Sequence, residues 1–129
     1  MKLTEGDMIT LNEITLEELH YLHDSDIVRI DFEEGIKVGI LLCQCYGTGD
    51  NPPHHYATID FGHCKGIGMT IEEKELDPRK YYWDTCIQKI RRFNGEWALD
   101  THVCGIPNGR IVFKGADRPI LTIGKKIPW

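Results

Sequence analysis

Six side chains of the kinds that bind metal ions lie within residues 43–64 of this sequence. They are three cysteines and three histidines: Cys43, Cys45, His54, His55, His63 and Cys64. Their spacing matches neither the Cys-x2-Cys nor the His-x3-His pairs that are typical of zinc sites. Cys43 and Cys45 are also expected on one face of a strand, where cysteines are commonly buried in the core. The metal hypothesis is therefore a zinc site formed by His54, His55, His63 and Cys64, which would have to converge with the strand face that carries Cys43 and Cys45.

Thiol catalysis is a second chemistry that these residue types allow. A nucleophilic cysteine needs a histidine that accepts its proton and a third group that orients the histidine. The sequence offers several combinations and its spacing selects none of them: Cys64 or Cys86 as nucleophile, His102 or His55 as base, and Asp60 or Asp100 as the orienting group.

Cationic and aromatic side chains are close together in the sequence between residues 79 and 97. Residues 79–93 contain five basic residues and one acidic residue, a net charge of +4. Guanidinium groups pair with phosphates, and aromatic rings stack on bases. These properties predict a site for a small anionic or nucleotide-like ligand, made of Arg79, Lys80, Tyr82, Trp83, Arg91, Arg92 and Trp97. The alternative is that Trp83 and Trp97 are core residues that the arginines cover.

Charge is distributed unevenly along the chain, whose formal net charge is −5. Residues 1–34 contain ten acidic and two basic residues (−8), while residues 110–126 contain five basic residues and one acidic residue (+4). The two basic segments could form one anion-attracting face. The acidic total argues against long nucleic acid as a partner, because affinity for it comes mostly from neutralised phosphates. The acidic segment favours a second hypothesis, a protein-interaction or inhibitor domain that docks on a basic partner surface.

The elements that position these residues are mostly strands. Thr15–His23 has a capping box and predicts one short helix. Glu34-Gly35 predicts a hairpin turn between strands 27–32 and 36–46. Asn94-Gly95 predicts a type I′ hairpin in which Arg92 faces Trp97, Ile90 faces Leu99, Lys89 forms an ion pair with Asp100, and Ile87 faces His102. Asn108-Gly109 predicts a further hairpin, so that strands 87–93, 96–104, 111–113 and 120–123 form a four-stranded meander.

The length of 129 residues and the hydrophobic content of 41% predict one compact domain over residues 1–129. We expect a mainly β fold, an antiparallel barrel or two-layer sandwich of seven or eight strands with one N-terminal helix. An α+β roll is the alternative. Five cysteines, with no signal peptide or membrane-spanning stretch in the sequence, favour reduced thiols and the cytoplasm.

Three functions follow from these observations. The first is a non-catalytic binding module, expected to be a homo-oligomer, for a small anionic or nucleotide-like ligand. The second is the protein-interaction domain that uses the acidic segment. The third is a metal-dependent or thiol enzyme built on residues 43–64. We expect no cofactor, and zinc is the ion that the metal-dependent version of the third function would use.

Overall fold

The computed structural model describes residues 5–12, 22, 25–43, 54–71, 86–103 and 106–126, which form nine antiparallel strands. Their bounds are β1 Met8–Thr10, β2 Asp26–Asp31, β3 Ile36–Cys43, β4 His54–Gly62, β5 Gly66–Ile71, β6 Cys86–Phe93, β7 Glu96–Val103, β8 Ile106–Lys114 and β9 Ile120–Lys126. The mainly β class is confirmed. The helix predicted over Thr15–His23 lies outside the described residues, apart from the buried Leu22.

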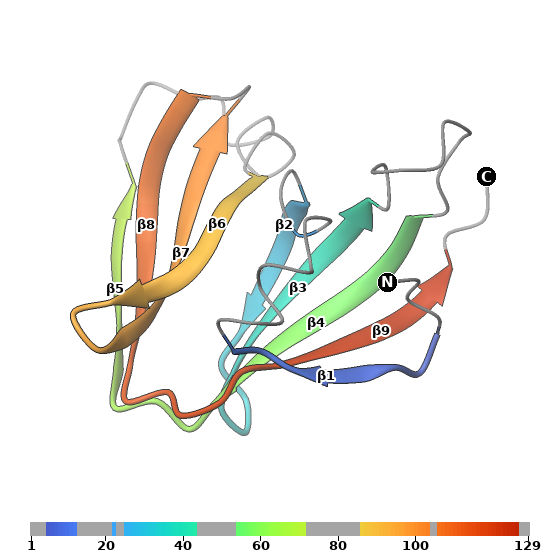
Figure 1. Cartoon of the computed structure of the whole chain (residues 1–129), viewed down its shortest axis with the longest axis horizontal. Helices are drawn as coiled ribbons and strands as arrows, with labels where there is room; N and C mark the ends of the chain where they lie inside the picture. The colour runs from blue at the N-terminus through green and yellow to red at the C-terminus, as the bar shows by residue number, and fades with distance from the viewer. Residues whose placement is uncertain are drawn as a thin grey trace.

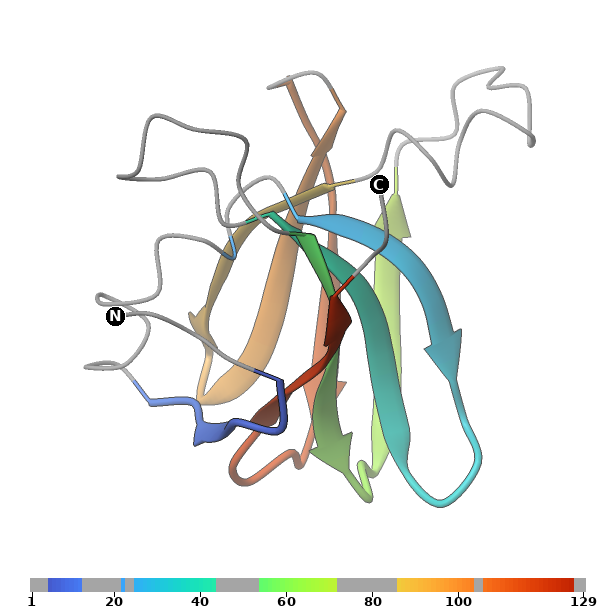
Figure 2. The same cartoon turned by 90° about the vertical axis from the view of Figure 1, so that its right-hand side faces the viewer.

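All nine strands belong to one sheet, in the order β1-β9-β4-β3-β2-β6-β7-β8-β5. The sheet is sharply bent, so that β1, β9, β4, β3 and β2 form one wing and β6, β7, β8 and β5 form the other (Figure 1). Figure 2 shows how strongly the longer strands curve. Among the described residues the sheet ends at β1 and at β5 and does not close, so an open bent sheet is found in place of the predicted closed barrel.

The two wings are hydrogen-bonded to each other where β2 meets β6. The register there contains a single pair, Asp26 opposite Cys86, and the amide of Ile87 donates to the carbonyl of Ser25 over 2.9 Å. Elsewhere the chain itself links the wings, since β4 leads into β5 and β8 leads into β9. The wings are held together mainly by their shared core.

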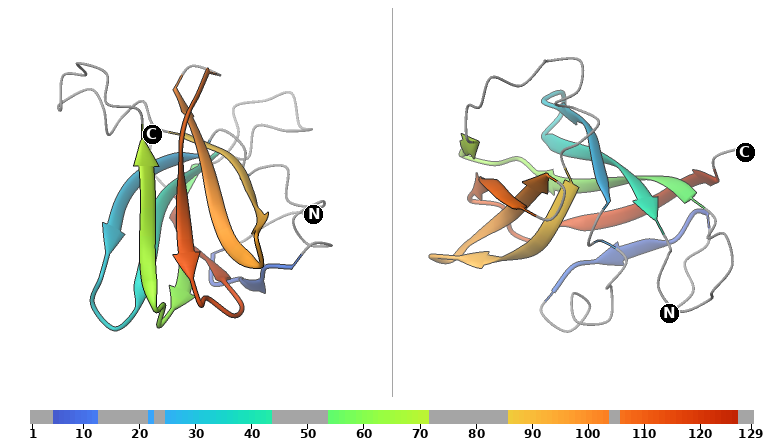
Figure 3. Two further views of the ribbon diagram at one scale, coloured as in Figure 1. Left: turned by 90° about the vertical axis from the view of Figure 1, so that its left-hand side faces the viewer. Right: turned by 90° about the horizontal axis from the view of Figure 1, so that it is seen from above.

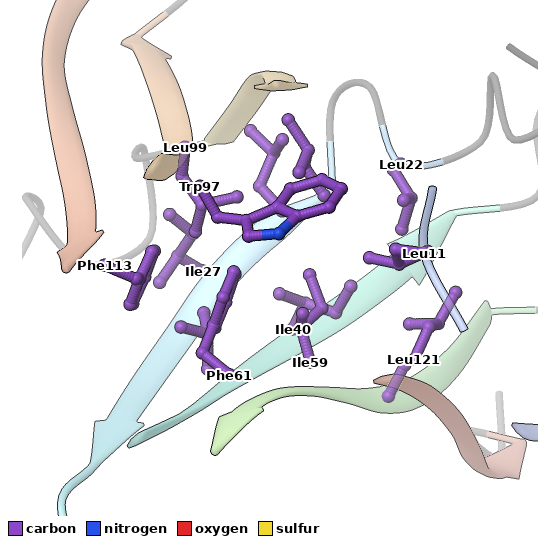
Figure 4. Packing of buried hydrophobic residues seen from close by; sticks show 14 of the residues in the cluster. Leu11, Leu22, Ile27, Ile40, Ile59, Phe61, Trp97, Leu99, Phe113 and Leu121 are labelled. Atoms are coloured by element: carbon purple, nitrogen blue, oxygen red, sulfur yellow. The ribbon is translucent and has the colours of Figure 1, made fainter. Parts of the chain in front are cut away.

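That core is a single cluster of buried apolar side chains from both wings. Figure 4 shows Trp97 and Phe113 of one wing close to Phe61 and Ile40 of the other. The rings of Phe61 and Phe113 stack with centroids 3.6 Å apart, and Phe113 is fully buried. The indole of Trp97 is 4% exposed, and its Nε1 donates to the carbonyl of Asp117 over 3.0 Å. Trp97 is thus a core residue.

Two of the three hairpins predicted from local sequence are present, those at Glu34-Gly35 and Asn94-Gly95. Glu34 and Gly35 have φ of 51° and 104°, and Asn94 and Gly95 have φ of 50° and 78°. At Asn94-Gly95, where Phe93 faces Glu96, positive φ at both central residues matches a two-residue type I′ turn. The turn at Glu34-Gly35 is longer, because five residues lie between the last register pair, Asp31 and Lys37. Strand β2 therefore returns as β3, and β6 returns as β7.

The predicted register of β6 against β7 is correct near the turn and wrong further away. Arg92 faces Trp97, Ile90 faces Leu99 and Lys89 faces Asp100, as expected. A register shift between Ile87 and Lys89 then places one extra residue, Gln88, in β6. As a result Ile87 faces Thr101 instead of His102, and Cys86 faces His102.

The predicted four-stranded meander is wrong in two respects. Asn108-Gly109 lies inside β8, because His102 and Val103 pair with Pro107 and Ile106, so the paired strands extend beyond this dipeptide. The last strand, β9, pairs with β4 and β1 and not with β8. Of the four strands predicted to form the meander, only β6, β7 and β8 are consecutive neighbours in the sheet. The other side of β8 pairs with β5.

Candidate functional site

The face of β7 and β8 that points away from the core carries a set of charged side chains. On β8, Ile111 and Phe113 are buried, so the alternate residues Arg110, Val112 and Lys114 lie on the opposite face. We call this side of strands β5 to β8 the outer face. Their neighbours on it from β7 are Glu96, Ala98 and Asp100.

The carboxylate of Asp100 lies between two arginines on the outer face. Its Oδ2 accepts from Nε of Arg91 on β6, and its Oδ1 accepts from Nε of Arg110 on β8, both over 2.7 Å. The side chain of Asp100 is 18% exposed, that of Arg91 30% and that of Arg110 34%. Charge-assisted bonds of this length hold side chains in one conformation. These three side chains, which we call the Asp100 triplet, come from the adjacent strands β6, β7 and β8. They combine two cations with one anion, so the triplet has a net positive charge.

A groove of about 640 Å³ lies on the outer face beside the triplet. Its lining residues come from β5, the β6–β7 turn, β7 and β8: Gly68, Asn94, Glu96, Gly109, Arg110, Val112 and Lys114. The single acid among them, Glu96, already accepts a hydrogen bond from the amide of Gly115 over 2.7 Å. Arg110 and Lys114 thus give this groove a cationic lining.

The structure separates the cations that the sequence placed in one ligand site. Arg91 and Arg92 are consecutive in β6, and consecutive strand residues point to opposite faces. Arg91 lies on the outer face in the Asp100 triplet, whereas the guanidinium of Arg92 lies over the Trp97 ring, 5.1 Å from its centroid. Because Trp97 is buried, its ring is not exposed for stacking on a ligand. The other predicted members, Arg79, Lys80, Tyr82 and Trp83, lie outside the described residues.

Sequence reasoning missed Arg110 and Lys114 as individual ligand residues, although it noted the basic segment that contains them. The signal that identifies them is the alternation of residues 110–114, in which apolar core residues occupy positions 111 and 113. The predicted ion pair of Lys89 with Asp100 is replaced by pairs of Asp100 with two arginines. Lys89 is directly opposite Asp100, but the carboxylate bonds to Arg91 and Arg110.

The residues proposed for a zinc site lie at two ends of β4. The start of β4 lies beside the end of β3, with Leu42 opposite His55. His63 and Cys64 follow the other end, at least about 20 Å away at a rise of about 3.3 Å per residue. His55 is 7% exposed, and its Nδ1 lies 3.1 Å from the carbonyl oxygen of Gly124. The side chains of Cys43 and His54, and all of Cys45, lie outside the description. No group of three or more His, Cys, Asp or Glu that could hold a metal ion occurs among the described residues.

Cys64 has a partly buried thiol. Its Sγ donates weakly to the carbonyls of Phe61 and Gly62, at 3.5 and 3.7 Å, and the side chain packs against the core. Burial, followed by the charges of Asp60 and Glu96, raises the pKa of this thiol. A raised pKa lowers the thiolate fraction, and the thiolate is the nucleophile. The environment of Cys64 therefore opposes nucleophilic activation.

We expect Cys64 to be alkylated more slowly than an unperturbed cysteine at neutral pH, with its rate rising to a plateau at a higher pH than that of the unfolded chain. Below the usual thiol pKa both states are protonated; as pH rises the unfolded thiol ionises first, so the difference is largest between the unfolded and folded pKa values. Mass spectrometry after iodoacetamide pulses, with the Cys64 peptide followed in native and denatured protein, measures this. Equal pH profiles in the two states would contradict the expectation.

Cys86 and His102 form the one Cys–His pair, among those considered from the sequence, that the register places directly opposite each other. Directly opposite residues share a face and have neighbouring Cβ atoms. The third group is Asp26 of β2, which the sequence reasoning did not include. The Cys86 thiol donates to Oδ1 of Asp26 over 3.0 Å, whereas a catalytic pair requires the histidine to accept the thiol proton. This contact crosses the junction of the two wings, and in it the thiol proton is directed to a carboxylate.

Together these features define the protein as an open, antiparallel β domain with a cationic groove on one outer face. No known protein family model matches its sequence, and no solved structure is significantly similar to its fold. Within the described ranges, no helix is long and apolar enough to cross a membrane.

Proposed function

We propose that this protein is a binding module for a small anionic ligand, which Arg110 and Lys114 hold in the outer-face groove. The observation that carries the proposal is the charge arrangement of this groove. Its acid is bonded to a backbone amide, and the adjacent carboxylate is paired with two guanidinium groups. The described lining of the groove contains two cations and one acid, so an anion that enters it meets a net positive charge.

Strand positions also favour binding, because groups on paired strands are held more rigidly than groups on loops. Arg110 and Lys114 lie on β8, which has a hydrogen-bonded neighbour on each side, β7 and β5. Arginine and lysine are the side chains that proteins use for phosphates and carboxylates. A nucleotide-like ligand belongs to this class through its phosphates. The buried ring of Trp97 gives no support to base stacking there.

The test is a titration with pyrophosphate, compared between the unaltered protein, Lys114→Gln, and Arg110→Gln with Lys114→Gln combined. A hydrogen bond to a charged group contributes about 1.5 to 3 kcal/mol, so we expect roughly a tenfold increase in Kd for Lys114→Gln and a larger one for the double variant. Isothermal titration calorimetry at low salt gives the affinities.

Lys125→Gln is the matched control, because it removes one exposed cation from β9 on the other wing. We expect this control to retain the Kd of the unaltered protein. Equal weakening by Lys125→Gln and Lys114→Gln would show that pyrophosphate responds only to net charge, and absence of measurable binding to the unaltered protein would refute the proposal. Thermal unfolding of each variant establishes that the fold is retained.

A further inference from the structure

Strand β5 ends the sheet on the wing that carries the groove. All six of its residues are paired with β8 on one side, and within the described residues no strand pairs with its other side. Figure 3 (left) shows β5 beside β8 at this end of the sheet. An edge strand presents unpaired N–H and C=O groups to which another extended chain can bond.

The sequence of β5 lacks the features that usually prevent such pairing. Proteins protect edge strands with charged side chains, proline, bulges or very short length. Gly66–Ile71 reads GIGMTI, which contains no charged residue and no proline, and its register with β8 is continuous over six pairs. By contrast β1, at the other end of the sheet, is only three residues long.

Two glycines connect this edge to the cationic groove. Gly66 and Gly68 occupy outer-face positions of β5, opposite Lys114 and Val112. The side chain of Lys114 extends from β8 over them. Its Cδ is 3.8 Å from the point where a Cβ would lie if Gly66 had a side chain, and its Cε is 3.9 Å from the corresponding point at Gly68. No side chain of β5 therefore separates Lys114 from a chain lying along the edge at these two positions.

We propose that the ligand of the groove is an acidic segment of an extended peptide, which adds to β5 as a further antiparallel or parallel strand. This inference rests on the proposed function and specifies the class of its ligand. Backbone bonds to the β5 edge would supply part of the affinity, and a glutamate or aspartate on the outer face would meet Lys114 above the glycines. Adjacent strands lie about 4.8 Å apart, so the added strand lies about 10 Å from β8. The four-carbon stem of lysine and a glutamate side chain together span that gap.

The charge of the groove selects this occupant among extended chains. A peptide with lysines at the same positions would place its ammonium groups against Arg110 and Lys114, and like charges held close together are unfavourable. A second copy of this chain pairing edge to edge would bring two uncharged β5 strands together and leave both cationic grooves without an anion. The acidic peptide satisfies the backbone and the cations together.

The experiment compares four synthetic peptides, each six residues long to match β5. They are an acetylated peptide of alternating glutamate and threonine, two versions of it with N-methyl groups on one or the other set of alternate amides, and a lysine–threonine peptide. Pyrophosphate is titrated in parallel. We expect the acidic peptide to bind and to slow hydrogen exchange of β5 amides. At least one of the N-methylated peptides should bind at least about tenfold more weakly, because each lost backbone hydrogen bond contributes about 0.5 to 1.5 kcal/mol.

The outcomes separate the two proposals. If pyrophosphate binds but the acidic peptide does not, or if both N-methylated peptides bind as well as the parent, strand addition is refuted and the anion site stands. If the lysine–threonine peptide binds as tightly as the acidic one, the stated partner chemistry is refuted. If neither pyrophosphate nor the acidic peptide binds, both proposals fail. A dimer in size-exclusion chromatography that keeps β5 amides protected in the presence of the acidic peptide would identify a second copy as the occupant.

Discussion

Replacing Phe113 with alanine is expected to lower the free energy of unfolding by about 3 to 5 kcal/mol, the usual cost of removing a buried phenylalanine side chain. The ring is fully buried, and it stacks on Phe61 with centroids 3.6 Å apart. Phe113 belongs to β8 and Phe61 to β4, so this contact crosses from one wing to the other. Because β2 and β6 share one register pair, the wings depend on core packing more than on hydrogen bonds for their association. Urea unfolding followed by circular dichroism gives the free energy.

Two further variants show whether the effect comes from packing between the wings. Phe113→Leu retains most of the apolar volume and should cost clearly less than Phe113→Ala. Val112→Ala alters the adjacent, partly exposed outer-face position and should cost least. A loss of less than about 1 kcal/mol for Phe113→Ala would contradict a shared core, because such a value is typical of surface substitutions.

The parts of the fold that could be predicted from the sequence are those decided by neighbouring residues. Asn94-Gly95 specifies its turn because both residues adopt positive φ, and a two-residue turn fixes the register next to it. Gly35 likewise supplies a positive φ in the turn between β2 and β3. The register was predicted correctly as far as Lys89 and failed at Gln88, where β6 contains one extra residue. A bulge of this kind depends on how β6 must bend to meet β2, and no local pattern reports that requirement.

Strand neighbours that lie far apart in the sequence could not be predicted in this way. The alternation in Ile120–Lys126 identifies a strand but does not state its partner. It pairs with β4 and β1, so the chain crosses from one wing to the other after β8. Asn108-Gly109 shows the related error, since a dipeptide typical of turns lies within β8 once residues 106 and 107 pair with β7.

The candidate site illustrates why closeness in sequence was misleading. His55 and His63 are near each other in the chain, yet β4 is extended and holds them at its two ends. Arg91 and Arg92 are adjacent, yet the period of two in a strand points them to opposite faces. The groove instead combines residues from separate segments, Arg110 and Lys114 of β8 with Glu96 of β7 and Gly68 of β5. Only the pairing of β5, β8 and β7 brings them together.

Replacing Asp100 with asparagine is expected to lower the free energy of unfolding and also to lower the Kd for an anion in the groove. The carboxylate accepts from two guanidinium groups over 2.7 Å each and is 18% exposed. Asparagine keeps the shape and one acceptor oxygen but removes the negative charge that balances Arg91 and Arg110. Losing charge-assisted bonds at a partly buried position costs about 1 to 3 kcal/mol in the free energy of unfolding, measured by urea denaturation.

The same substitution removes a negative charge that repels any anion in the groove. Across roughly 10 Å at the effective dielectric of a protein surface, this repulsion amounts to about 1 to 2 kcal/mol, so pyrophosphate should bind roughly tenfold more tightly at low salt. Glu5→Gln, which removes an exposed acid beside β1 at the opposite end of the sheet from β5, should leave the Kd almost unchanged. Added salt should reduce the gain from Asp100→Asn, because screening weakens the interaction between partly exposed charges. Unchanged or weaker pyrophosphate binding in a folded Asp100→Asn variant would place the anion away from this triplet, whereas tighter binding combined with lower stability would show that Asp100 holds the two arginines in place and limits the attraction of their charge.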